Sequence, residues 1–127
     1  MVTKGFKALL AEANAEIESI GAHEALALHG DPDVVFVDVR ESGERAKGSI
    51  PDSVAAPRGF LEFIADPEGP SHRPELVSGK KLILVCASGG RSALSGMTLR
   101  SMGIDNIVNL TGGMAAWQQV GGPVESN

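Results

Sequence analysis

The stretch LILVCASGGRSAL, residues 82–94, decides the fold because it contains a strand, a turn and the start of a helix. Leu82 to Val85 is an uninterrupted apolar run, as expected for a strand buried on both faces of a sheet. Gly89 and Gly90 then predict a tight turn, since glycine adopts backbone conformations that other residues avoid. A helix is expected from Ser92 to Met102.

The same alternation of strand and helix continues along the chain. Further strands are expected at Val34 to Val37 and Ile107 to Leu110, with a weaker candidate at Ser53 to Ala56. Residues 66–81 are polar and contain proline, which indicates a surface loop. Short apolar strands alternating with helices imply a mostly parallel sheet covered on both faces. Further helices are expected at His23–His29, Phe60–Ala65 and Gly113–Val120.

The first segment of the chain predicts an amphipathic helix. Its apolar residues recur at helical spacing, with acidic residues on the other side. We expect this helix to pack on its own domain; packing on a partner is the alternative. The apolar positions are Phe6, Leu9, Leu10, Ala13, Ile17 and Ile20.

Length and composition predict one globular domain, residues 1–127, with 43% hydrophobic and 21% charged residues. A net charge of −5 argues against broad nucleic-acid binding, which needs clustered Lys and Arg. A single cysteine cannot form an internal disulfide, and no apolar run is long enough for a membrane span or signal peptide. A cytoplasmic protein is therefore expected. Nothing in the sequence indicates an oligomeric state.

The single cysteine, Cys86, lies between the apolar strand and the glycine turn. Backbone N–H groups of the turn, the N-terminus of the following helix and the charge of Arg91 all favour a thiolate over a thiol. We therefore expect Cys86 to have a lowered pKa and to be nucleophilic. The alternative is that Cys86 is simply a small buried hydrophobic residue.

Several motifs together resemble the rhodanese-like sulfurtransferase family. CASGGRS (86–92) is similar to the family's active-site loop C-x-x-G-x-R-S, and DVRE (38–41) to its D-x-R-x motif. GSIPDSVAAP (48–57) resembles the segment G-H-I-P-G-A-x-N-x-P. LTGG (110–113) with Trp117 and GPV (122–124) resembles the closing motif. The resemblance covers about residues 17–124, preceded by the N-terminal helix. It implies a three-layer α/β domain with a five-stranded, mostly parallel sheet.

The resemblance implies sulfur transfer through a persulfide on Cys86. The thiolate takes sulfur from a small anionic donor such as thiosulfate and passes it to cyanide or a thiol, which can be a protein thiol. Cys86 and Arg91 are then the catalytic residues. The residues expected to bind substrate are Ala87, Ser88, Gly89, Gly90, Ser92 and Arg58. No metal or organic cofactor is implied.

Asp38 and Arg40 are interpreted as structural support beneath the site, because buried charges need partners. Two residues depart from the family pattern: Ser49 replaces the usual His, and Asp52 replaces a frequent Gly. Both changes are expected to affect local packing. Trp117 is expected in the core, and Gly112 with Gly113 in a tight turn into the last helix.

Two other functions are compatible with this fold. A cysteine phosphatase needs a loop with one more residue, C-x-x-x-x-x-R, whereas four residues separate Cys86 from Arg91 here. A loop this short suits a single sulfur atom better than a tetrahedral oxyanion. The other alternative is a module without significant turnover that binds a partner or carries sulfur, although modules that only bind a partner often lack the cysteine that this chain retains.

Overall fold

The computed structural model describes residues 1–126 and contains one five-stranded parallel sheet. The strand order is β1-β5-β4-β2-β3. The strands are β1 (Ser19–Ile20), β2 (Val34–Asp38), β3 (Val54–Ala55), β4 (Lys81–Val85) and β5 (Ile107–Leu110). The helices are α1 (Phe6–Glu16), α2 (Ala22–Leu28), α3 (Ser42–Ala46), α4 (Leu61–Ala65), α5 (Gly90–Ser101) and α6 (Gly113–Gln119). Two 3₁₀ turns are η1 (Arg58–Phe60) and η2 (Pro74–Val77).

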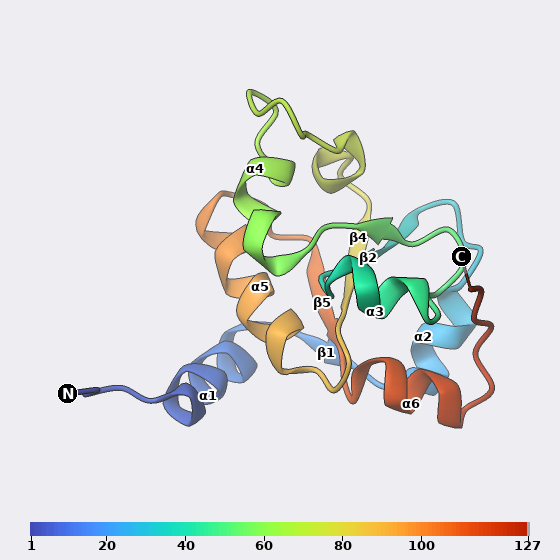
Figure 1. The fold of residues 1–127 in the computed structure, drawn as a ribbon, viewed down its shortest axis with the longest axis horizontal. Helices are drawn as coiled ribbons and strands as arrows, with labels where there is room; N and C mark the ends of the chain where they lie inside the picture. The colour runs from blue at the N-terminus through green and yellow to red at the C-terminus, as the bar shows by residue number, and fades with distance from the viewer. Residues whose placement is uncertain (127) are drawn as a thin grey trace.

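Helices cover both faces of the sheet, as Figure 1 shows. Successive side chains of a strand point to opposite faces, so a strand buried on both sides is apolar throughout. In β4, Leu82 and Leu84 pack with α4 and α5, whereas Ile83 and Val85 pack with α2 and α6. Trp117 of α6 is fully buried in the second cluster, as predicted. The predicted three-layer α/β fold is confirmed.

The prediction for the first segment is wrong in part. The helix α1 ends at Glu16, and Ile20 lies in the short edge strand β1, paired with Leu110 of β5. Helical spacing was misleading because Ile17 and Ile20 need burial in either conformation, and the open edge of β5 supplies backbone partners. Only Ala13 of α1 is buried, and Phe6 is 67% exposed. The helix packs against α5 of its own domain.

Two other segments differ from the prediction. Residues 66–81 are not simply a surface loop, because η2 lies within them and its Leu76 is fully buried against α4. The helix α3 was not predicted. It begins with a capping box in which Glu41 and Glu44 satisfy each other's backbone N–H groups.

The order of the strands positions the site. β4 is the central strand, with β2 on one side and β5 on the other. Because the sheet is parallel, the ends of β2, β4 and β5 lie at the same edge. Ligand sites in such sheets lie beyond the carboxyl ends of the strands. Asp38, Cys86 and Thr111 therefore come together at one edge.

Candidate active site

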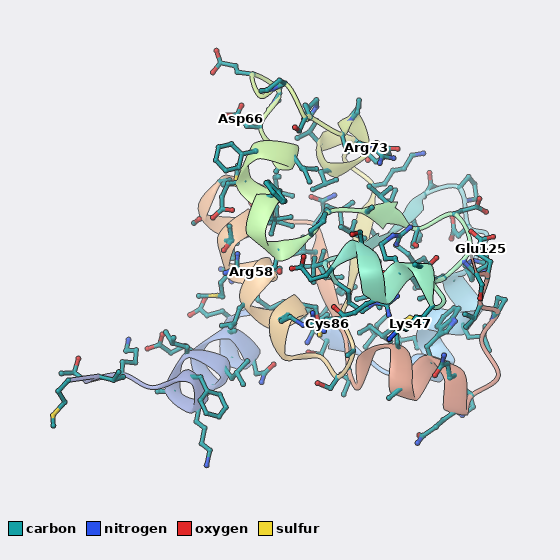
Figure 2. The ribbon with its side chains drawn as sticks, in the orientation of Figure 1. Lys47, Arg58, Asp66, Arg73, Cys86 and Glu125 are labelled. Atoms are coloured by element: carbon teal, nitrogen blue, oxygen red, sulfur yellow. The ribbon has the colours of Figure 1, made fainter. Side chains whose placement is uncertain are left out.

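Cys86 lies directly after β4, where the chain turns into α5 (Figure 2). The alternation of β4 directs it to the face covered by α4 and α5, and the residue is 1% exposed. The turn is possible because Gly89 has φ 106°, a left-handed conformation that favours glycine. The helix then begins at Gly90, two residues earlier than predicted. This places Arg91 and Ser92 in the first helical turn.

The sulfur of Cys86 accepts hydrogen bonds from its own loop. Gly89 N–H donates to Sγ at 3.0 Å, and the Ser92 hydroxyl lies 3.4 Å from it. Burial raises the pKa of the thiol, but hydrogen bonds from Ser92, Gly89 and Ser88 more than offset this and lower the pKa below its ordinary value. The loop therefore favours the thiolate through short-range hydrogen bonds.

The guanidinium of Arg91 is not free, because it is paired with an acidic side chain. It forms a bidentate ion pair with Glu44 of α3, with N–O distances of 2.7 and 2.9 Å. The hydrogen bonds from Glu44 raise the pKa of Arg91, and those from Arg91 lower the pKa of Glu44 to about 2. The charge of the Cys86 thiolate also raises the pKa of Arg91. The pKa of Cys86 itself is lowered by the hydrogen bonds of its own loop.

The N-terminus of α6 holds the loop from behind. Met114 N–H donates to Cys86 O at 2.8 Å, and Ala115 N–H donates to Ala87 O at 3.2 Å. This approach needs Gly113, since a Cβ there would lie 2.3 Å from Cys86 O. The predicted tight turn before this helix is present, with Gly112 at φ 75° and Gly113 at φ 54°. Its role is to bring α6 against the cysteine loop.

Asp38 and Arg40 form a buried ion pair beneath the edge of the sheet, with Arg40 Nη2 2.9 Å from Asp38 Oδ2. Arg45 adds a second ion pair to Asp38 at 3.0 Å. Arg40 also donates to Gly48 O at 2.8 Å. These contacts tie the end of β2 to α3 and to the following segment. The geometry is that of a structural brace.

Arg58 begins the 3₁₀ turn after β3, and its backbone N–H donates to Val39 O at 3.0 Å. The side chain of Arg58 forms no hydrogen bond or ion pair with any of the described residues, so no acidic partner neutralises its positive charge. Ala87 and Ser88 are exposed at the loop surface. Arg73, by contrast, pairs with Glu75 on the 66–81 segment, away from Cys86 in Figure 2.

Sequence reasoning missed two residues of the site, Glu44 and Asn109. Glu44 has a signal in retrospect: it stands three residues after Glu41, the spacing of a capping box. Asn109 is a polar residue in the otherwise apolar strand β5, is 4% exposed and contacts both Gly89 O and the Ser92 hydroxyl. A buried amide needs hydrogen-bond partners, so an asparagine within an apolar strand could have been recognised as a residue that bonds to its neighbours.

Residues 1–126 contain no cluster of three or more His, Cys, Asp or Glu side chains that could hold a metal ion. Within the same range, none of the helices is both long and apolar enough to cross a membrane. An open groove of about 340 Å³ lies against the cysteine loop. It is lined by Leu10, Asn14, Ser19, Ser88, Gly89, Gly90, Asn109, Thr111 and Gly112.

Comparison with known proteins agrees with this geometry. The family model for the rhodanese-like domain matches residues 21–120 of this chain. A sulfurtransferase of Allochromatium vinosum is 31% identical over 86% of this chain and 92% of its own. The thiosulfate:glutathione sulfurtransferase of Saccharomyces cerevisiae is 38% identical, over 72% of this chain and 70% of its own. This chain spans less than half of some other curated relatives.

A solved structure from Rhodopseudomonas palustris, of a protein of unknown function described as a possible tyrosine phosphatase, has a TM-score of 0.93. It is 43% identical, and the match covers 98% of this chain and 97% of that one. The family match spans most of the chain, and the sheet order and cysteine loop are consistent with it. This chain belongs to the rhodanese-like domain family.

Proposed function

We propose that the protein is a sulfurtransferase that carries sulfur as a persulfide on Cys86. The observation that carries this proposal is the hydrogen bonding of the Cys86 sulfur by Gly89 N–H and the Ser92 hydroxyl, which lowers the pKa of the thiol. The family and the relatives named sulfurtransferases support sulfur transfer in general. Residues 1–127 then act as one catalytic domain.

The proposed reaction has two displacement steps. The Cys86 thiolate attacks the outer sulfur of thiosulfate, the sulfur–sulfur bond of the donor breaks, and sulfite leaves with the electron pair. A thiol or cyanide then attacks the outer sulfur of the persulfide and releases the thiolate. The loop amides of Ala87 to Ser92 hold the negative outer sulfur, and Arg91 and Arg58 attract the anionic donor. Asp38 and Arg40 support the loop.

Phosphatase activity is the second candidate, because the similar Rhodopseudomonas protein is described as a possible tyrosine phosphatase. The size of the loop disfavours it. Four residues separate Cys86 from Arg91, and Gly89 N–H is already 3.0 Å from the sulfur. A loop of this length suits one further sulfur atom better than a tetrahedral phosphate. The Arg91 fork, which a phosphatase needs for two phosphate oxygens, is occupied by Glu44.

The test measures thiocyanate formed from thiosulfate and cyanide. We expect activity in the wild type and none in Cys86→Ser, because a serine alkoxide is scarcely formed at neutral pH. Ser101→Ala, at the exposed far end of α5, is the control and should retain full activity. Hydrolysis of p-nitrophenyl phosphate is measured in parallel. Activity on the phosphate alone would contradict the proposal, and a fully active Cys86→Ser would exclude Cys86 as the carrier.

A further inference from the structure

The Ser92 hydroxyl has one hydrogen and three neighbouring acceptors. Asn109 Oδ1 lies at 2.5 Å, Gly89 O at 3.2 Å and Cys86 Sγ at 3.4 Å. Ser92 is fully buried and Asn109 is 4% exposed, so the Ser92 hydroxyl takes its hydrogen-bond partners from the protein. A hydroxyl donates one hydrogen at a time. The sulfur and Asn109 therefore compete for it.

The orientation of the Asn109 amide follows from its two neighbours. Gly89 O can only accept, and Asn109 Nδ2 donates to it at 3.2 Å. The amide oxygen must then face Ser92. The strand fixes this position, because Asn109 pairs with Ser19 of β1 and Leu84 of β4. Asn109 thus holds an acceptor against the Ser92 hydroxyl from β5, a strand that is paired on both sides.

We propose that Asn109 is a positioning residue that takes the Ser92 hydrogen bond whenever the Cys86 sulfur is uncharged and yields it to the thiolate. This inference rests on the proposed function. In the thiolate, the charge on Sγ draws the Ser92 hydrogen. In the persulfide, the charge moves to the outer sulfur, and the hydroxyl turns back to Asn109. Only a rotation of the hydroxyl is needed, since no heavy-atom bond is made or broken in this exchange.

The direction of the effect distinguishes this role from simple support of the loop. If Asn109 competes with the sulfur for one hydrogen, then removing Asn109 leaves Ser92 free to stabilise the thiolate. If Asn109 only holds the loop together, then removing it disturbs the N–H groups and destabilises the thiolate. Gly89 O keeps the N–H of Ala93 at 3.1 Å as a partner in either case.

The charges around Cys86 come from other elements and stay unchanged. Arg91 of α5 is bound to Glu44 of α3, and Asp38 with Arg40 lies at the end of β2. None of these side chains contacts the Ser92 hydroxyl. Asn109 is neutral, so its replacement alters hydrogen bonding without altering charge.

The first experiment measures the rate of Cys86 alkylation by iodoacetamide against pH. In Asn109→Ala we expect the pKa of Cys86 to fall by about half a unit or more, the size of one neutral hydrogen bond. Asn106→Ala is the matched control and should not shift the pKa, because Asn106 lies just before the start of β5 and its amide donates to Lys80 O. An unchanged or raised pKa in Asn109→Ala would overturn the inference.

The second experiment asks whether Asn109 acts through Ser92. Ser92→Ala should raise the pKa of Cys86, and adding Asn109→Ala in that background should change nothing further. An equal fall in both backgrounds would overturn the inference. If the alanine variant does not fold, Asn109→Val keeps a strand-forming side chain and removes the same acceptor. Alkylation needs no sulfur donor, so this test stands apart from the transfer assay that tests the proposed function.

Discussion

The reactivity that we propose for Cys86 depends on its nearest hydrogen-bond donors more than on the nearby positive charge. Gly89 N–H and the Ser92 hydroxyl contact the sulfur, whereas the Arg91 guanidinium is paired with Glu44. An ion pair presents a smaller net charge to its surroundings than a free arginine does. We therefore expect a modest electrostatic role for Arg91 and an opposing one for Glu44.

Arg91→Ala should raise the pKa of Cys86 by less than about one unit and slow its loading by thiosulfate, because the loop amides remain. Arg91→Lys should rescue in part, since lysine restores the charge but not the planar fork. Glu44→Gln should lower the pKa of Cys86 by unmasking the charge of Arg91. Alkylation rates against pH measure all three. A midpoint shared by every variant would remove both residues from the mechanism.

Asp52 stands where the family often has glycine, and it is the one non-glycine residue among those described with a positive φ, at 67°. Asp52→Gly should raise the free energy of unfolding by about 0.5 kcal/mol, since relief of strain exceeds the extra freedom of the unfolded chain. Asp105→Gly, outside this region of φ, is the control and should be destabilising. Urea unfolding measures the stability of both variants. If both lose the same free energy of unfolding, the argument from strain at Asp52 is refuted.

At the scale of elements, α6 supports the cysteine loop through two backbone hydrogen bonds to Cys86 and Ala87. Gly113→Ala should lower the free energy of unfolding by about 1 kcal/mol or more through its positive φ, and should also displace Cys86 and reduce thiocyanate formation. Gly121→Ala is a matched control, because Gly121 has φ 78° with open space around its Cβ position. It should lose stability but keep activity. Equal thiocyanate formation by Gly113→Ala and Gly121→Ala would show that α6 does not position the cysteine loop.

Helices and strands with a strong apolar pattern were predicted well from the sequence. The elements that were missed depend on a local capping box or on contacts with distant parts of the chain. β5 lies at the predicted residues, and α2, α4 and α6 differ from prediction by one residue at one or both ends. The short helix α3 contains Gly43 and lacks an apolar stripe, so only its capping box signals it. β1 was missed because two residues have no periodicity; their strand conformation depends on pairing with β5.

At the scale of the whole molecule, the loop motif located Cys86, but the sequence could not show which partner each charged side chain takes. Arg91 and Glu44 are 47 residues apart in sequence and meet only because α3 and α5 lie at the same edge of the sheet. Asn109 reaches Gly89 for the same reason, since β4 and β5 are neighbours. Order of strands, not local sequence, determines these contacts.

The central claim is that Cys86 accepts sulfur, and intact mass spectrometry of the whole chain tests it most directly. After incubation with thiosulfate and removal of the excess, the wild type should gain the mass of one sulfur atom. The gain should disappear after treatment with cyanide. Cys86→Ser should gain nothing under the same conditions. A folded wild type whose mass stays unchanged, or an equal gain in Cys86→Ser, would contradict the account.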